Sequence, residues 1–273
     1  MKYKLVCLDM DGTLLNDNKE VSDKNKEGIK RLLENDIKVA VTTGRPYVNA
    51  GYFADLIGQD LPIIASNGAY IYEKGEGVIY SKSLSKGNVI NIIRTLKENG
   101  YSPQFHGAKD IYTEKLEYSA LFISKLNQII PEKNRMKINV LNSFDEIIYN
   151  YKDEFLKCIL IDEDEEKLLK LKEQLKKLKG IEVVSSSKIN IEIMEKGISK
   201  GEAVGNLAKY LGIGLNQVAA IGDNENDLSM IKRAGLGIAM GNAADLVKKE
   251  AKNITLSNNE DGVFYAIDKF ILS

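Results

Sequence analysis

Residues 4–13, KLVCLDMDGT, contain the most informative pattern in the sequence. The first five of these residues form a short apolar run that is typical of a buried strand. Side chains two positions apart on an extended chain point to the same side, so we expect the carboxylates of Asp9 and Asp11 to converge where this strand ends. Ligands of open α/β sheets bind outside the carboxyl ends of the strands. DMDGT therefore predicts an acidic site at that edge, against the simpler interpretation of a charged turn.

The same pattern of a strand followed by a helix recurs in the N-terminal and C-terminal parts of the chain. Apolar runs predict strands at Lys4–Leu8, Lys38–Thr42, Leu61–Ala65, Val218–Ile221, Leu236–Ala239 and Ile254–Ser257. Helices are predicted at Ser22–Glu34, Ser199–Leu211, Glu225–Ala234, Ala243–Ala251 and Val263–Phe270. Such alternation is typical of an α/β fold, a doubly wound (Rossmann-like) parallel sheet with helices on both faces.

The middle of the chain differs from its two ends. At about 150 residues per domain, 273 residues correspond to about 1.8 domains. Residues 84–189 are richer in Lys, Glu, Asn and Tyr, and their clearest element is an amphipathic helix at Glu163–Lys179. We therefore predict one core made of residues 1–83 and 190–273, interrupted by an inserted α+β domain at 84–189.

The composition excludes several classes of protein. Lys and Arg number 38 and Asp and Glu 39, a net charge of −1, which provides no electrostatic footprint for nucleic acids or anionic membranes. Uncharged stretches fall short of the ~18 apolar residues of a membrane span, and the N-terminus has no recognisable signal peptide. Cys7 and Cys158 lie in apolar runs, which favours buried thiols over a disulfide. We expect a cytoplasmic monomer or small homo-oligomer.

Three further polar segments lie at strand ends or helix starts. Asp223, in GDNEND (222–227), follows a predicted strand as Asp9 does, and Thr43 ends another strand. Lys200 opens a helix and offers a positive charge to a phosphate. Each has an ordinary alternative, namely a helix cap for Asp223 and Thr43 or an exposed lysine for Lys200. Adjacent carboxylates repel each other without a cation, so together these residues predict a Mg²⁺ site beside a phosphate.

These motifs carry a resemblance to a known family. Asp9–Thr13, Thr43-Gly44-Arg45-Pro46, Asn67-Gly68-Ala69, Lys200-Gly201 and Gly222–Asp227 resemble the motifs of the haloacid dehalogenase (HAD) superfamily. Their spacing is similar to that of the Cof-type hydrolases, which carry a large α/β cap between the second and third motifs. The likeness covers essentially the whole chain.

The resemblance implies a role for each core residue. Asp9 is the nucleophile and a Mg²⁺ ligand, and Asp11 is the general acid/base that also gives Mg²⁺ its backbone carbonyl. Asp223 completes the protein ligands of the metal. Thr43 and Lys200 bind the transferred phosphoryl group.

The remaining residues of the motifs have supporting roles by the same resemblance. Asn226 lies beside the phosphoryl group, and Asp227 orients Lys200 or a metal-bound water. Arg45 and Asn67 face the crevice, and Gly12 and Gly44 complete their motifs. His106, the only histidine, lies in the presumed cap. A lone histidine is more often a surface or hydrogen-bonded residue, yet its position makes it a candidate substrate contact.

Three functions follow from these residues. The first is a Mg²⁺-dependent phosphatase that hydrolyses a small phosphorylated metabolite, such as a sugar phosphate, through an aspartyl-phosphate. The second is a phosphomutase or phosphotransferase on sugar phosphates, which the core motifs do not distinguish from a phosphatase. The third is a non-enzymatic phosphoacceptor or ligand sensor. Receiver domains place the accepting aspartate on a middle strand, and here Ala65-Ser66-Asn67 has none, which counts against the third.

Overall fold

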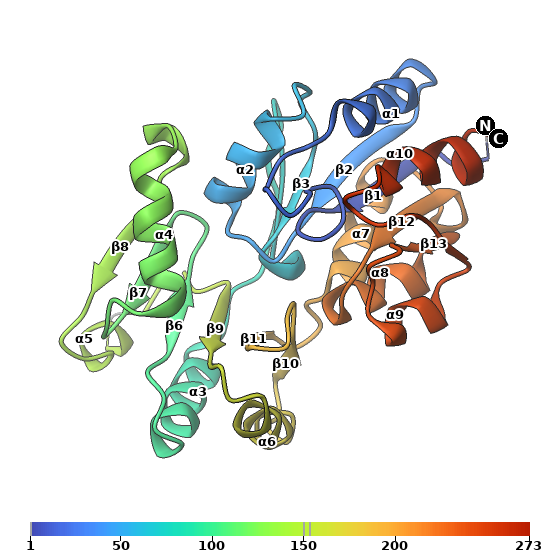
Figure 1. Ribbon diagram of the computed structural model, residues 1–273. Helices are drawn as coiled ribbons and strands as arrows, with labels where there is room; N and C mark the ends of the chain where they lie inside the picture. The colour runs from blue at the N-terminus through green and yellow to red at the C-terminus, as the bar shows by residue number, and fades with distance from the viewer. Residues whose placement is uncertain (1, 150, 153) are drawn as a thin grey trace.

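The computed structural model describes residues 2–149, 151–152 and 154–273. In this part of the chain the larger sheet has eight strands, in the order β14-β13-β12-β1-β2-β3-β4-β5 (Figure 1). In that order the strands are Asn253–Ile254, Leu236–Ala239, Val218–Gly222, Leu5–Asp9, Lys38–Thr42, Ile63–Ala65, Tyr70–Glu73 and Gly77–Ser81. Pairings from β14 to β3 are parallel, whereas β3–β4 and β4–β5 are antiparallel.

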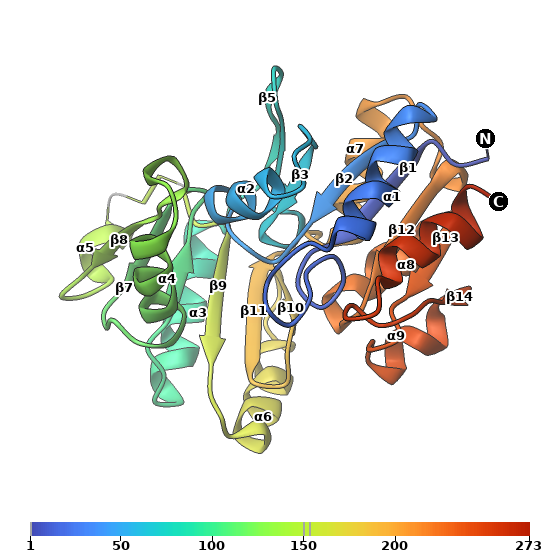
Figure 2. The ribbon, with the colours of Figure 1, turned by 45° about the horizontal axis from the view of Figure 1, so that its top comes forward.

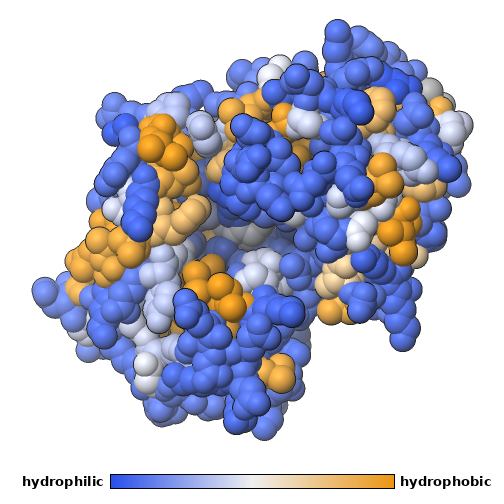
Figure 3. Space-filling model, viewed as in Figure 1, coloured by the Kyte–Doolittle hydropathy of each residue, from blue (hydrophilic) through white to orange (hydrophobic). Residues whose placement is uncertain are grey.

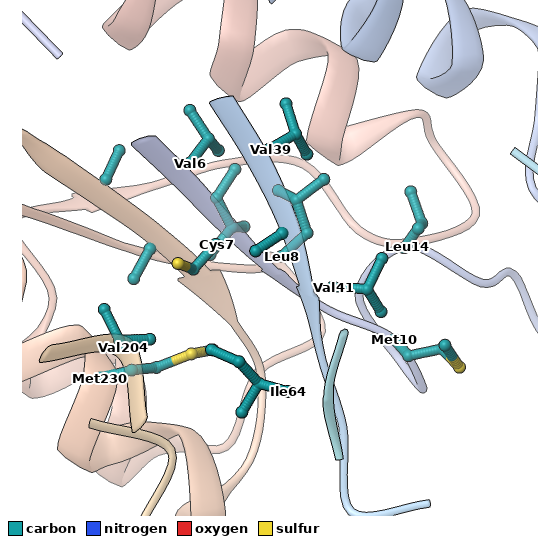
Figure 4. Close-up of a cluster of buried hydrophobic side chains, with 14 of the residues drawn as sticks. Val6, Cys7, Leu8, Met10, Leu14, Val39, Val41, Ile64, Val204 and Met230 are labelled. Carbon is teal, nitrogen blue, oxygen red and sulfur yellow. The ribbon is translucent and has the colours of Figure 1, made fainter. Parts of the chain in front are cut away.

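The centre of this sheet is buried on both faces. Every residue of β1 is buried, as are four of the five residues of β2. Strands of this kind are near-continuous apolar runs, because helices cover both sides of a parallel sheet. Figure 4 shows Val6, Leu8, Val39 and Val41 of these strands, and Met230 beside Ile64 and Val204, within one hydrophobic core. Polar residues therefore gather where the buried strands β1 and β2 end.

Helices flank this sheet. They are α1 (Asp23–Glu34), α2 (Tyr47–Asp55), α7 (Lys200–Tyr210), α8 (Leu228–Arg233), α9 (Asp245–Glu250) and α10 (Gly262–Ala266), with short turns η1 (Ser66–Gly68), η3 (Leu215–Gln217), η4 (Glu225–Asp227) and η5 (Ile267–Ile271). Helix α1 packs against α10, and α7 packs against α8. Figure 2 shows α1 in front of the sheet and α7 behind it. Among the described residues, no helix is both long and apolar enough to cross a membrane.

The smaller sheet has six strands, in the order β10-β11-β9-β6-β7-β8. In that order they are Ile181–Val184, Asn190–Glu195, Lys157–Ile161, Gln104–His106, Asp110–Thr113 and Lys137–Val140. Its helices are α3 (Lys86–Glu98), α4 (Tyr118–Ile129), α5 (Asp145–Ile148) and α6 (Glu165–Leu175), with the short turn η2 (Glu132–Asn134). Residues from α3 and α6 pack with Phe105 and Cys158 in a second hydrophobic core. Helices α3 and α6 therefore cover one face of this sheet, and α4 packs over part of the other, where Ala120 and Ile123 cluster with Ile111.

The predicted fold class, a doubly wound parallel core with an inserted α+β domain, is confirmed. Five of the six predicted strands lie within two residues of their predicted bounds, whereas the last, predicted at Ile254–Ser257, is a two-residue strand at Asn253–Ile254. The expected return to the core at residue 190 is too early. Strand β11 (Asn190–Glu195) pairs with β9 and β10, so the chain returns to the core only between Glu195 and Lys200. The hairpin β4–β5 and the π-helical turn that continues α10 also lie outside the predicted elements.

Candidate active site

Three buried carboxylates meet at the carboxyl edge of the larger sheet. Asp9 ends β1, Asp223 follows the neighbouring strand β12, and Asp227 closes the turn after it. One oxygen from each carboxylate lies within 4.8 Å of the others. Oxygen donors of this kind suit a hard divalent cation such as Mg²⁺. The acidic site thus includes the Asp227 carboxylate. The family resemblance implies for Asp227 only that it orients Lys200 or a metal-bound water.

Crowding and burial change the pKa values of this cluster. Burial raises the pKa of Asp9 well above its usual range, and the charge of Asp227 raises it further, against the opposing effect of Lys200. Burial, again with the charge of Asp227, raises the pKa of Asp223 to about 6. Lys200 has no exposed side-chain surface and donates hydrogen bonds to Asp9 and, at 2.6 Å, to Asp227 Oδ1. Burial opposes its charged form, but the two carboxylates prevail and raise the pKa of Lys200.

The loop that follows Asp9 and Asp11 approaches Asp223 closely at a glycine. Gly12 has φ +81°, and a Cβ added there would lie 2.5 Å from Asp223 Oδ2. Thr13 donates a hydrogen bond to Asp223 Oδ1 at 2.9 Å. Asp227 Oδ2 accepts hydrogen bonds from the backbone N–H of Asp223 at 2.9 Å and of Asn224 at 3.0 Å. Asp223 is therefore fixed from both sides.

Asp11 does not join the carboxylate cluster through its side chain. Its oxygens accept hydrogen bonds from Arg45 Nε at 2.6 Å, Arg45 Nη2 at 2.7 Å and Lys19 Nζ at 3.1 Å. Burial alone would raise the pKa of Asp11, but Arg45 and Lys19 hold it below its usual range. The family resemblance implies that Asp11 is the general acid/base, a role that requires its protonated form. In this arrangement Asp11 is an ion-paired carboxylate, and its backbone carbonyl remains the predicted metal ligand.

The predicted segments that contain Thr43 and Asn67 lie beside the carboxylate cluster. Thr43 is buried, and its Oγ1 accepts a hydrogen bond from the Arg45 backbone N–H at 3.0 Å. Asn67 lies in a tight turn with φ 54°, a conformation that costs free energy and tends to occur at functional sites. Its Oδ1 accepts a hydrogen bond from Asn226 Nδ2 at 3.1 Å, and its Nδ2 donates to Glu192 of the smaller sheet at 2.9 Å.

A cavity of about 280 Å³ lies between the two sheets, where Figure 3 shows the surface hollowed. Asp9, Asp11, Thr43, Gly44, Arg45 and Asn226 line it from the core, so the structure brings these predicted residues together. In the described part of the chain, Asp223 and Lys200 are not among the residues that line the cavity. They lie behind Asp9, which both of them approach.

The inserted domain supplies the opposite wall of the cavity. His106 lines it and is buried, with Nε2 3.3 Å from Ser119 Oγ. Burial, with the nearby charge of Lys157, lowers the pKa of His106 well below its usual range, so the ring is neutral. Lys157 and Glu192 form a buried ion pair in this wall at 2.5 Å.

Lys157, Glu192 and Ser119 line the cavity but were not predicted from the sequence as site residues. The first two are single charged residues in apolar strands, KCILI (157–161) and NIEIM (190–194), and that irregularity is the signal that could have identified them. Nothing in the sequence distinguishes Ser119 from an ordinary helix-start serine.

Comparison with known proteins agrees with this geometry. A family model described as haloacid dehalogenase-like hydrolase matches residues 6–267. The 5-amino-6-(5-phospho-D-ribitylamino)uracil phosphatase YcsE of Bacillus subtilis is 33% identical, over 98% of this chain and 96% of that protein. Phosphatase YwpJ of the same organism is 30% identical, over 95% of this chain and 97% of that protein. A haloacid dehalogenase-like hydrolase structure from B. subtilis has a TM-score of 0.85 at 29% identity, covering 98% of this chain and 100% of that chain.

The family match spans nearly the whole chain, and the aspartates of the family's motifs stand together at one sheet edge. The inserted domain therefore corresponds to the cap of these proteins. The chain belongs to the haloacid dehalogenase-like hydrolases and is a phosphatase of the Cof type.

Proposed function

We propose that this phosphatase hydrolyses small phosphorylated metabolites, requires Mg²⁺ and forms an aspartyl-phosphate on Asp9. The observation that carries the proposal is the position of Asp9, whose carboxylate belongs to the buried acidic cluster and also lines the cavity. A nucleophile has to reach both its activating groups and its substrate, and Asp9 is the aspartate of the cluster that does so.

The acidic cluster fits the expected metal. Asp9 and Asp223, with the Asp11 carbonyl, would hold Mg²⁺, and the hydrogen bonds from Thr13 and from the backbone keep Asp223 in position. When bound, Mg²⁺ would offset the mutual repulsion of the carboxylates and the negative charge of the phosphate.

The protein residues divide the remaining work. Thr43 and Lys200, with Asn226, would hold the phosphoryl group while an Asp9 oxygen attacks phosphorus and the ester oxygen leaves with a proton from Asp11. Asp11 would then take a proton from the water that attacks the aspartyl-phosphate, which releases phosphate and restores Asp9. For this role the Asp11 carboxyl has to be released by Arg45 and Lys19, whose hydrogen bonds favour its ionised form.

The volume of the cavity suits small substrates. A volume of about 280 Å³ is at the lower end of ordinary ligand sites, which begin at roughly 300 Å³. Two relatives from Bacillus subtilis are named 5-amino-6-(5-phospho-D-ribitylamino)uracil phosphatases, and the phosphate in that name is carried by a sugar-alcohol chain. We propose substrates of that order of size, such as sugar or sugar-alcohol phosphates.

A phosphate-release screen over a panel of phosphorylated metabolites tests this function. With Mg²⁺ we expect turnover of several small phosphomonoesters, loss of turnover in EDTA and its recovery when Mg²⁺ is added back. Asp9→Asn serves as the blank. Turnover that persists in EDTA would contradict the metal requirement, and isomerised phosphate esters in place of free phosphate would identify a phosphomutase.

A further inference from the structure

Strand β9 of the cap sheet presents one polar side chain to the cavity and is otherwise apolar. Side chains alternate along β9, so Lys157, Ile159 and Ile161 face the cavity whereas Cys158 and Leu160 pack in the cap core. A lysine is costly to bury unless it is paired, and here its exposed side-chain fraction is 3%. Its position therefore calls for an explanation beyond packing.

Two of the three N–H donors of Lys157 have partners. The ammonium group donates to Glu192 Oε2 at 2.5 Å and to the Gly44 carbonyl oxygen at 2.6 Å. A lysine ammonium has three donors. Among the described residues the third has no hydrogen-bond acceptor, although the side chain lines the cavity. The ammonium group therefore lies next to the core loop that follows Thr43, and Lys157 pairs with His106 between β6 and β9.

Glu192 holds the Lys157 ammonium group in this place, and the acceptor positions of its own carboxylate are all occupied. Its Oε2 also accepts a hydrogen bond from Asn67 Nδ2 at 2.9 Å, and its Oε1 accepts from Ser186 Oγ at 2.5 Å and Asn190 Nδ2 at 3.5 Å. A carboxylate has about four acceptor positions, so these bonds leave none for a ligand. Glu192 is thus a positioning residue, and the free donor belongs to Lys157.

We propose that Lys157 is the cap residue that recognises the leaving group, by donating its third N–H to a hydroxyl or ether oxygen close to the phosphoester bond. The inference rests on the proposed phosphatase function and narrows its substrates to oxygen-rich, polyol-like phosphomonoesters. Lys157 lies beside Gly44, one residue from Thr43, so the oxygen it meets belongs to the part of the leaving group nearest the phosphate.

If Lys157 has this role, the same wall should disfavour a purely apolar leaving group. Such a group would cover the lysine without offering it an acceptor, and an unpaired buried donor on a charged group is costly. Ile159 and Ile161 on the same strand provide apolar contacts for the carbon chain. The cap therefore combines carbon-chain contacts with one placed donor.

Two esters of equal chain length test this assignment, sn-glycerol 3-phosphate and n-propyl phosphate, which differ in two hydroxyl groups. We expect the wild-type enzyme to favour sn-glycerol 3-phosphate in kcat/KM by about tenfold or more, the size expected for a hydrogen bond to a charged group. For an ester that is not hydrolysed, the comparison uses its inhibition constant against p-nitrophenyl phosphate. Equal values for the two esters in the wild-type enzyme would overturn the proposal.

Lys157→Met should abolish this preference. Because that change leaves Glu192 as a buried unpaired charge, the double variant Lys157→Met/Glu192→Gln repeats the test without it. The matched control is Lys172→Met, since Lys172 is a buried cap lysine that pairs with the core residue Glu225 at 2.6 Å and does not line the cavity. The control should keep the preference for the hydroxylated ester even if its overall rate falls.

The outcomes separate this inference from the proposed function. If the wild-type enzyme releases phosphate from p-nitrophenyl phosphate and the double variant keeps the wild-type ratio between the two esters, Lys157 is not the recognition residue. If the wild-type enzyme hydrolyses no phosphomonoester with Mg²⁺, the proposed function itself fails.

Discussion

At the residue scale, the close contact between Gly12 and Asp223 gives a direct test of the site geometry. Gly12→Ala introduces a Cβ at 2.5 Å from Asp223 Oδ2 in a backbone conformation with φ +81°. We expect Asp223 to be displaced and kcat/KM to fall by about a hundredfold or more, with a loss of about 1–3 kcal/mol in unfolding free energy. Steady-state kinetics and urea unfolding measure the two effects.

The matched control for Gly12→Ala is Gly75→Ala. Gly75 has φ +93°, and a Cβ added there meets nothing within 4 Å. It carries the same kind of backbone strain without the contact to Asp223, so we expect a similar loss of stability and full activity. Equal activity of the two variants would show that the glycine matters for backbone strain alone.

Single residues also show what sequence does and does not predict. The positions of Asp9, Asp223 and Thr43 could be anticipated, because a residue at the end of a predicted parallel strand has only one edge of the sheet to occupy. The ion pair between Asp11 and Arg45 could not, since a side chain's partner depends on how loops from different strands approach each other. The Lys157–Glu192 pair likewise depends on the register of two cap strands.

At the element scale, the six strands predicted for the core are short apolar runs, and the hairpin β4–β5 is the part of the core sheet that was not predicted. The hairpin β4–β5 turns at Gly75 and Gly77, both with positive φ, and its second strand is partly exposed. Strand β11 was assigned to the wrong domain because its sequence does not reveal which sheet it joins. Pairing partners are tertiary information, which local hydrophobic patterns do not contain.

Helix α7 gives a prediction at this scale. Ser199 is its N-cap and accepts a hydrogen bond from the Glu202 N–H at 3.1 Å, immediately before Lys200. We expect Ser199→Ala to lower the free energy of unfolding by about 1 kcal/mol, whereas Ser199→Asp should retain most of the wild-type stability. Chemical denaturation of the three proteins checks this. An alanine variant as stable as the aspartate variant would show that the cap contributes nothing.

At the scale of the whole molecule, the two cysteines report on the two domains separately. Cys7 lies in the core sheet and Cys158 in the cap sheet, and burial raises the pKa of each thiol to about 12. The thiolate is the reactive form, so neither thiol should react appreciably with a disulfide reagent at pH 8 in the folded protein. Both should react at once in denaturant, as absorbance of the released thiol would show.

The same experiment locates any weak point in the structure. Fast modification of one cysteine in the native protein, identified by peptide mapping, would mean that its domain opens on its own. That result would contradict the burial seen for that sheet.

In the proposed reaction, Asp9 receives the phosphoryl group. The direct measurement is trapping during turnover, in which the enzyme is quenched while it hydrolyses p-nitrophenyl phosphate with Mg²⁺ and is then reduced with borohydride. An aspartyl-phosphate is converted to homoserine, which peptide mass spectrometry locates. We predict homoserine at position 9 and none in an enzyme sample without substrate. Turnover without homoserine at position 9, or with modification at another aspartate, would contradict the account.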